Sequence, residues 1–363
     1  MSLAFLQSAL AVVVTLGLVI LCHEFGHFIV CRLLGVRVER FAFGFGPELI
    51  GWTGRLKTRF SLHAIPLGGF VKPAGEDISE CSGAKDEYYG QNWHRRLAIV
   101  FAGPTMNYVL AWALFTGVVY FQGIPEAGTA PVIGNLVSGF PADKGGVLIG
   151  DEVTAVAGLR VDSWETLAKA IHASPGKELE LSVKRASGIV RVRVLPRKDD
   201  ATGRGVVGIM PQPVYREVGP VEAVVEGAKQ CAHLTAFTIQ TIGSKLLKRE
   251  KPDLAGPVGI AQMVSRAAHS SFEDLVFLIG LISVAIGFFN LLPIPLLDGG
   301  HAVLYLWEGV SGRKLTSNTV NAANSVGIFF LLFLLVFATY NDFSRIYRER
   351  AARKAAVSQP KQP

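Results

Sequence analysis

The sequence predicts a mainly α-helical membrane protein with about four transmembrane helices, a membrane-associated β-hairpin loop and one inserted α+β domain. Half of the 363 residues are hydrophobic and only 18% are charged. Uncharged runs long enough to cross a bilayer recur along the chain, and one stretch between them has the composition of a soluble domain. The predicted spans are residues 3–22, 97–121, 275–297 and 319–340.

These spans divide the chain into five predicted regions. They are an N-terminal membrane half (1–122), an inserted domain (123–197), a linker with an amphipathic interfacial helix near 221–248 (198–270), a C-terminal membrane half (271–345) and a basic tail (346–363). The formal charge of +7 requires no nucleic-acid partner, because Lys and Arg accumulate beside membrane spans. The partner that this composition predicts is the lipid bilayer.

The first span leads directly into the run His23-Glu24-Phe25-Gly26-His27. Histidines four positions apart lie on one helix face, so both imidazoles can reach a single zinc ion, and the glutamate between them can take a proton from water. Ionisable groups at bilayer depth cost several kcal/mol unless they are paired or bound. We therefore predict a metal site with His23 and His27 as ligands and Glu24 as the catalytic base.

The loop after this span contains two alternating stretches, residues 41–47 and 58–65, which are typical of strands. Pro66-Leu67-Gly68-Gly69 is expected to turn the chain between the second stretch and Phe70. Two interpretations stay open. The loop could be a small soluble β-meander, or a hairpin that dips beside the active site and offers a strand edge to an extended substrate.

Charge predicts the orientation of the spans. Ten Lys and Arg residues lie between Arg32 and Arg96, which places this loop in the cytoplasm and the N-terminus outside. The C-terminal tail is evidence against this orientation. Four spans would place the tail outside, although its basic residues favour the cytoplasm. Its basic residues are Arg345, Arg348, Arg350, Arg353, Lys354 and Lys361.

The second span contains Gly103 and Pro104, which suggest a local break or a close helix approach. Asn107 lies in the same span and needs a polar partner. An interhelical hydrogen bond and a catalytic role are both compatible with its position.

The inserted stretch has short β-like runs at 132–137, 152–156, 179–183 and 190–195, with a helix near 163–172. This order resembles a PDZ domain of the kind found in bacterial envelope proteases, which can capture peptides by strand addition. Ile133-Gly134-Asn135-Leu136 stands where we expect the Gly-Leu-Gly-Phe carboxylate-binding loop.

The third span ends in the run from Asn290 to His301, where Pro293 and Pro295 are expected to break the helix. Asp298 could supply the oxygen that two histidines need for a three-ligand catalytic zinc with one open position. Two alternatives remain at this point. Asp298 could be an ordinary turn residue beside two glycines, and His301 is a rival ligand.

Together, the HExxH run, the Phe-Gly-Phe-Gly-Pro and Pro-Leu-Gly-Gly segments, the Gly103–Asn107 stretch, the PDZ-like insert and the NxxPxPxLDGGH ending resemble the site-2 protease family. The resemblance is greatest to the bacterial regulators of sigma-E type, although those often carry two PDZ domains and this chain has room for one. It implies an intramembrane zinc metalloprotease with His23, His27 and Asp298 as ligands and Glu24 as base. It also implies substrate positioning near Asn107 and Asn290, and a membrane-entering hairpin around Gly68 and Gly69.

The implied substrates are single-pass membrane proteins such as anti-sigma factors, or signal-peptide remnants, cleaved in the bacterial inner membrane during regulated intramembrane proteolysis in a stress response. The implied orientation puts the PDZ-like domain outside and the active site near the cytoplasmic side. Two other classes of protein are retained as alternatives. A non-catalytic PDZ scaffold would not need Glu24 beside two histidines, and a different membrane-anchored zinc peptidase would take its third ligand from a Glu on a soluble helix.

Overall fold

The computed structural model describes residues 3–186, 188–200, 202–248 and 256–358. The chain forms two compact units. The first, called the membrane unit, comprises Met1–Val119 and Gly219–Pro363, and the second, called the inserted unit, comprises Tyr120–Val218. The tail predicted over 346–363 lies partly outside the described residues, as does the part of the linker at 249–255.

Within the residues that the structure describes, four helices are long and apolar enough to cross a bilayer. They are α1 (Leu3–Leu33), α2 (Trp93–Gln122), α7 (Phe272–Asn290) and α9 (Ser317–Ser358), of which Ser317–Arg348 is the candidate span. The predicted number of spans is therefore confirmed. α1, α2 and α9 each contain an uncharged run of bilayer length, and the charged residues of α7, Glu273 and Asp274, lie in its first turn, so burying these spans in lipid costs little.

The third span is shorter than the predicted 275–297, because α7 ends at Asn290. Pro293 and Pro295 have no backbone N–H to continue the helical hydrogen-bond ladder, so an irregular segment follows. A separate helix, α8, then runs from Asp298 to Ser311. The break puts Asp298 at the N-terminus of a helix instead of within a span.

Strands β1 (Val38–Thr53) and β2 (Arg59–Pro73) form an antiparallel pair with an irregular register. Residues 40–43 of β1 lie opposite both ends of β2, with Phe41 opposite Val71 as well as Phe60. Residues 59–62 of β2 pair with residues 40–43 in rising order, whereas residues 69–72 pair with the same residues in falling order. The chain therefore reverses direction between Leu62 and Gly69, where a turn was predicted at 66–69. Gly68, at φ +119°, has a backbone conformation that side-chain-bearing residues rarely adopt, and it permits this reversal.

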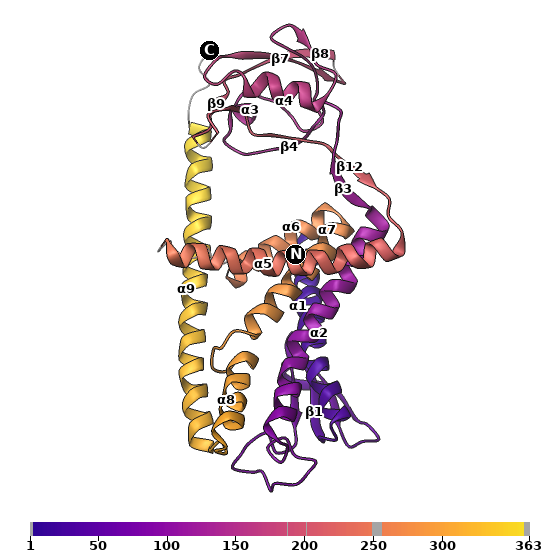
Figure 1. The fold of residues 1–363 in the computed structure, drawn as a ribbon, viewed down its shortest axis with the longest axis vertical. Helices are drawn as coiled ribbons and strands as arrows, with labels where there is room; N and C mark the ends of the chain where they lie inside the picture. The colour runs from indigo at the N-terminus through magenta and orange to yellow at the C-terminus, as the bar shows by residue number, and fades with distance from the viewer. Residues whose placement is uncertain (1–2, 187, 201, 249–255, 359–363) are drawn as a thin grey trace. The chain divides into compact units, whose positions relative to one another are not determined.

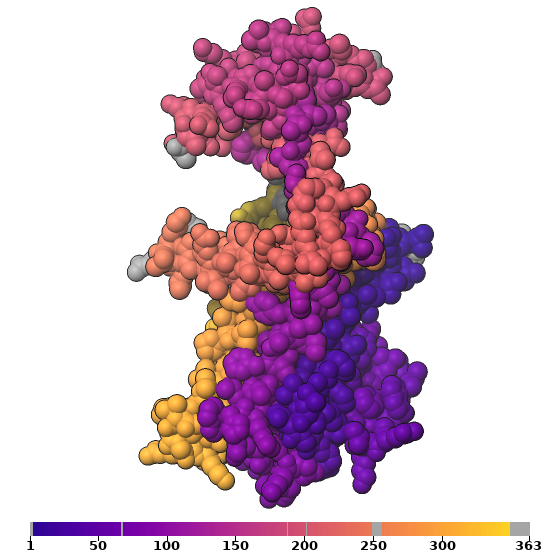
Figure 2. Space-filling model, turned by 45° about the vertical axis from the view of Figure 1, so that its right-hand side comes forward, coloured from indigo at the N-terminus to yellow at the C-terminus, as the bar shows by residue number. Residues whose placement is uncertain are grey.

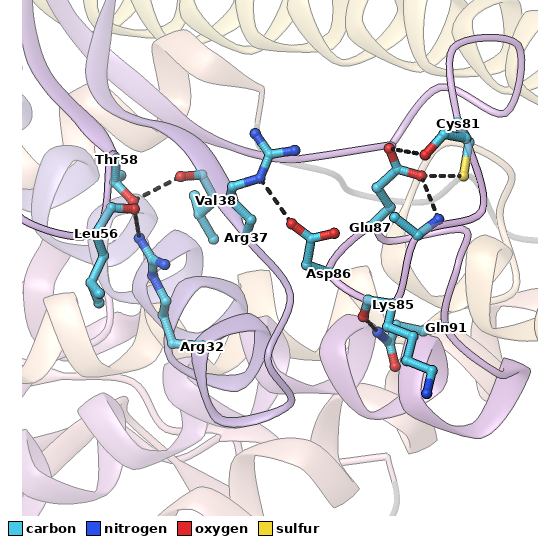
Figure 3. Close-up of polar contacts among 12 residues, drawn as sticks. Arg32, Arg37, Val38, Leu56, Thr58, Cys81, Lys85, Asp86, Glu87 and Gln91 are labelled. Atoms are coloured by element: carbon cyan, nitrogen blue, oxygen red, sulfur yellow. Dashed lines mark hydrogen bonds and ion pairs between the residues drawn. The ribbon is translucent and has the colours of Figure 1, made fainter.

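Polar contacts anchor this sheet to the loop that leads into α2 (Figure 3). Arg37 pairs with Asp86 at 3.2 Å, and Thr58 donates to the Val38 carbonyl at 2.7 Å. Glu87 accepts hydrogen bonds within the same loop, including one from the Ala84 amide at 3.1 Å. The loop is therefore a folded connection that fixes the sheet against the start of α2.

Helices α5 (Pro220–Leu247) and α6 (Pro257–Ser270) gather at one end of the membrane unit, away from β1 (Figure 1). The start of α1 contacts α6 through Ser8 and Ser265, whose hydroxyls lie 2.8 Å apart. The C-terminal part of the α9 span also contacts α6, because Asp342 accepts hydrogen bonds from the Gly256 and Gly259 amides at the start of α6. The N-terminus of α1 and the last part of the α9 span therefore lie at the same end of this unit.

Helix α5 lies along the outside of the membrane unit (Figure 2). It carries exposed apolar side chains such as Phe237, Ile239 and Leu247. Its surface is thus suited to a membrane interface, as predicted for residues 221–248.

The inserted unit is an α+β domain with a four-stranded antiparallel sheet in the order β6-β5-β7-β8. These strands are Leu159–Arg160, Glu152–Val156, Leu179–Arg185 and Gly188–Val194, and the sheet packs with helix α4 (Trp164–His172) around a core that includes Val153, Leu167 and Leu181. The remaining elements are β3 (Ile124–Ala127), β4 (Ile133–Leu136), α3 (Pro141–Lys144), β9 (Arg197–Lys198), β10 (Gly205–Val206), β11 (Ile209–Pro211) and β12 (Pro213–Arg216).

This unit extends further than the predicted 123–197, because the short strands after Pro196 pair back onto it. β11 pairs with β4, and β12 pairs with β3. A cavity of about 340 Å³ lies between α4 and residues 205–209. Ile133–Leu136, where the carboxylate-binding loop was expected, forms β4.

Candidate metal centre and active site

The first two candidate ligands come from one face of α1. His23 and His27 are one helical turn apart, and their Nε2 atoms lie 3.2 Å from each other. Both side chains are largely buried, with 11% and 14% of their surface exposed. The spacing in the sequence is thus sufficient to bring the two ring nitrogens together.

The third candidate ligand is Asp298, the first residue of α8. Its Oδ2 atom lies 3.1 Å from Nε2 of His23 and 3.5 Å from Nε2 of His27. Among the residues that the structure describes, these three form the group of His, Cys, Asp and Glu whose ligand atoms converge, all within 4.8 Å of one another. His301 does not belong to this group, and its ring stacks on Tyr305 instead.

The converging atoms fit a zinc ion. Two ligand atoms, each ~2.0–2.1 Å from one tetrahedral zinc, lie about 3.3 Å apart, close to the separations seen here. Asp298 Oδ2 is buried and has no hydrogen-bond partner among the described residues, which a cation would satisfy. A Cβ at Gly103 would lie 2.3 Å from His27 Nε2, so glycine at this position in α2 leaves room for the ligands.

The rings of both histidines are held by their other nitrogen. His27 Nδ1 donates to the Ile99 carbonyl at 2.7 Å, which leaves Nε2 free to bind a metal. His23 Nδ1 lies 3.3 Å from the amide of Asn107, whose Oδ1 atom is buried and has no hydrogen-bond partner within the described part of the chain. When the amide oxygen Oδ1 faces the Nδ1–H of His23, both atoms have a hydrogen-bond partner. His23 then has the same tautomer as His27, with Nδ1 protonated and Nε2 free.

Glu24 is held by the edge of the β-sheet. Its Oε2 atom accepts a hydrogen bond of 3.1 Å from the backbone amide of Val71 in β2. A Cβ at Gly69 would lie 3.6 Å from Glu24 Cγ and 2.8 Å from the Ala42 carbonyl oxygen. The hairpin therefore lies directly beside the glutamate, and residue 69 must be small.

A cavity of about 470 Å³ joins these groups. The three candidate ligands and Glu24 line it together with Phe70, Val71, Asn290, His301, Tyr305 and Asn324. Of the residues predicted to position substrate, Asn290 lines this cavity, whereas Asn107 is fully buried behind His23. Gly68 lies against the ring of Phe45 and continues the strand beside Glu24.

Three features of the site were not predicted. The Val71 amide and the Ile99 carbonyl are backbone groups, which carry no residue-specific signal in a sequence. Asn324 did have a signal, because Asn318, Asn321 and Asn324 recur at helical spacing at the start of an otherwise apolar span.

Two converging imidazoles and a carboxylate, with a glutamate beside them, are the donor set of a zinc hydrolase, and they lie on helices long enough to span a membrane or on a helix that adjoins one. The profile of Peptidase family M50 matches residues 11–334. The chain belongs to this family, and it is an integral-membrane zinc metalloprotease of site-2 protease type. A non-catalytic scaffold is thereby excluded.

Relatives of similar length support the assignment. The chain is 33% identical to a protein of Agrobacterium fabrum over 92% of this chain and 95% of the relative, and 33% identical to a Clostridium acetobutylicum protein over 91% and 95%. A Campylobacter jejuni protein is 33% identical over 94% of each chain. All three are named as candidate zinc metalloproteases.

Among solved structures, the chain is similar to the PDZ domain of an SdrC-like protein from Listeria innocua. The sequence identity is 19%, the TM-score is 0.21, and the match covers 24% of this chain and 99% of that domain. The corresponding domain from Listeria monocytogenes matches with 17% identity and the same TM-score, covering 24% of this chain and 90% of that domain.

Proposed function

We propose that this protein is an intramembrane endopeptidase that cleaves transmembrane segments of single-pass membrane proteins, such as anti-sigma factors or signal-peptide remnants, in regulated intramembrane proteolysis. The observation that carries the proposal is the location of the catalytic groups. His23, Glu24 and His27 lie on a helix long enough to span a bilayer, and Asp298 begins the helix after a broken span. Such groups are costly at this depth unless the reaction takes place there.

In this proposal His23, His27 and Asp298 would hold a zinc ion, which when bound would supply Lewis-acid polarisation of the carbonyl and a lowered pKa for water. Glu24 accepts the proton of that water while the water oxygen bonds to the carbonyl carbon. Glu24 then returns the proton to the amide nitrogen as the C–N bond breaks. The Val71 amide holds Oε2 of Glu24, so Oε1 is the oxygen available for proton transfer.

The substrate must be unwound before it is cut, because a transmembrane helix buries each carbonyl in its own hydrogen bonds. We propose that the end of β2 around Gly68 and Gly69 holds the unwound segment as an added strand, and that Asn290 contacts it in the cavity. Asn107 is fully buried against His23, and we assign it an indirect role through that ligand.

We place the protein in a bacterial inner membrane with the loop 32–96 in the cytoplasm and the inserted unit outside. The shared location of the α1 start and the α9 end supports an even number of crossings. This orientation puts the basic tail outside and the metal centre near the cytoplasmic side.

The decisive experiment uses the purified full chain in lipid vesicles with a single-pass reporter substrate. Glu24→Gln should retain zinc and fold but lower the cleavage rate by at least ~10²-fold, as expected for loss of a general base. Glu39→Gln is a matched control, because Glu39 forms only a solvent-exposed ion pair with Lys72 at 3.5 Å. Cleavage by the Glu24→Gln protein at the wild-type rate would remove Glu24 from the mechanism.

We further propose that the inserted unit and α5 exclude substrates that still carry a bulky external domain. Residues 129–211 can be replaced by a short linker, since Gly128 N donates to the Gln212 carbonyl at 3.2 Å and the β3–β12 pair would remain. The shortened protein should cleave untrimmed substrates that the full chain rejects. Unchanged selectivity would contradict the filter and leave the protease assignment standing.

A further inference from the structure

A second, smaller cavity of about 100 Å³ adjoins the metal-site cavity, between α8 and α9. We call it the side pocket. Leu296, His301 and Asn324 line both cavities, so the side pocket opens next to the catalytic groups. None of the roles assigned above uses it.

The inner walls of the side pocket are apolar. Val303 and Leu304 come from α8, and Ala323 comes from α9. Surfaces of this kind favour an aliphatic group over water, which would find too few polar partners. The pocket therefore suits a hydrocarbon side chain.

Close backbone contacts fix the shape of the pocket. A Cβ at Gly300 would lie 2.2 Å from the Ile294 carbonyl oxygen, and a Cβ at Gly327 would lie 2.3 Å from the Pro295 carbonyl oxygen. Both α8 and α9 are thus packed tightly against the irregular segment between α7 and α8. Walls held by backbone contacts cannot widen easily for a larger group.

The mouth of the pocket has features that point to a ligand. Leu296 has a positive φ of 77°, which is strained for a leucine, and such strain tends to persist at functional sites. His301 Nδ1 is buried and has no hydrogen-bond partner among the described residues. A peptide backbone passing the mouth could supply that partner.

We propose that the side pocket receives a substrate side chain that flanks the scissile bond, and that it selects aliphatic side chains up to about the size of leucine. This inference rests on the function proposed above. In an extended peptide the side chain next to the reacting carbonyl projects into whatever pocket opens beside it. The pocket is smaller than the ~150 Å³ apolar cavity that accommodates benzene, so an aromatic side chain should fit less well than an aliphatic one.

The test uses the zinc-loaded full chain in vesicles and single-pass reporters with Ala, Val, Leu or Phe at each position flanking the mapped cleavage site. At one of the two positions, kcat/KM should rise from Ala to Leu and fall by about tenfold or more for Phe. Ala323→Leu fills the pocket and should reduce cleavage of the Leu reporter by about tenfold while sparing the Ala reporter. Leu304→Ala enlarges it and should rescue the Phe reporter.

Ala322→Leu is the matched control, because Ala322 is the exposed neighbour on the same helix and should leave every ratio unchanged. Active Ala323→Leu and Leu304→Ala proteins with wild-type selectivity at both positions would overturn the proposal and indicate that another group, such as a lipid chain, fills the pocket. Failure of the zinc-loaded wild type to cleave any reporter would instead overturn the proposed function, and this inference with it.

Discussion

The backbone amide of Val71 donates a hydrogen bond of 3.1 Å to the Oε2 atom of Glu24. In the sheet, Val71 of β2 pairs with Phe41 of β1. The sheet edge that we propose to hold the substrate is therefore the same edge that orients Glu24, the proposed base. Any change that shifts this strand should alter catalysis before it alters metal binding.

The first prediction concerns Gly69. Gly69→Leu should lower the cleavage rate by ~10²-fold without loss of zinc, because a side chain there collides with the Ala42 carbonyl and displaces the strand from Glu24. Gly117→Leu is the control, since a Cβ at Gly117 meets no atom within 4 Å. The measurement is the cleavage rate alongside the zinc content of both variants. Loss of zinc from the Gly69 variant would mean that β2 supports the ligands themselves.

The second prediction concerns Asn107. Asn107→Leu should weaken zinc binding by about 10–100-fold, because His23 loses the hydrogen-bond partner of its Nδ1 atom. Asn107→Asp keeps an acceptor there and should retain more affinity. Competition with a chelator of known affinity measures the effect. Equal zinc affinity in the wild type and the Leu variant would show that Asn107 does not act through His23.

The third prediction concerns a buried ion pair between α2 and α8. Arg96 is 3% exposed, pairs with Glu308, and lies over the rings of Tyr89 and Tyr305 at 5.0 and 4.8 Å. Arg96→Met should destabilise the protein by about 3 kcal/mol, because it leaves a buried carboxylate uncompensated. Cleavage should fall as well, since α8 begins at the proposed ligand Asp298.

Thermal unfolding of the zinc-loaded protein in detergent measures this cost. The double variant Arg96→Met/Glu308→Leu removes both charges and should recover most of the lost stability. A double variant no more stable than Arg96→Met would show that the ion pair is not the source of the effect.

The fourth prediction concerns the pH dependence of the inserted unit. Burial alone would raise the pKa of Asp151, but hydrogen bonds from Arg185 and the Leu148 amide outweigh it and hold this pKa below its ordinary value. The unfolded chain therefore binds the proton more readily. The Asp151 carboxylate stabilises the folded unit above about pH 4, and this contribution is lost as the pH falls through the folded-state pKa.

Arg185→Met should lower the stability of this unit near neutral pH and flatten its dependence on acid. Arg191→Met is the control, because Arg191 forms only an exposed pair with Glu180. Calorimetry of the full chain between pH 3 and pH 7 follows the transition of the inserted unit. Parallel acid profiles for wild type and the Arg185 variant would contradict the assignment.

Sequence patterns predicted the parts of the structure that depend on side-chain chemistry. Uncharged runs of bilayer length correspond to four helices, and the residues expected to bind zinc, His23, His27 and Asp298, converge in the structure. Helical spacing explains the two histidines. Asp298 was predicted because two histidines need a third ligand and because the sequence resembles the site-2 protease family, whereas the helix α8 that begins at this residue was not predicted.

Other parts could not be derived in this way. Local turn chemistry predicted the reversal at residues 66–69, but not that both flanking segments, 59–62 and 69–72, pair with the same residues 40–43, because pairing partners depend on the tertiary fold. The strands after Pro196 contain two to four residues each, too few to show an alternating pattern. The sequence therefore did not predict that the inserted unit continues to Val218. The hydrogen bond from Val71 to Glu24 is donated by a backbone amide. Every residue except proline has this group, so the residue type at position 71 does not predict the bond.

The central claim is that His23, His27 and Asp298 form one zinc site in the membrane unit. The most direct test is the zinc content of the purified, detergent-solubilised protein, compared between the wild type and Asp298→Asn. We predict about one zinc per chain in the wild type and a large loss of zinc in the variant, because a neutral amide is a poor substitute for the carboxylate ligand. A variant that retains zinc at the wild-type stoichiometry and affinity would contradict this account.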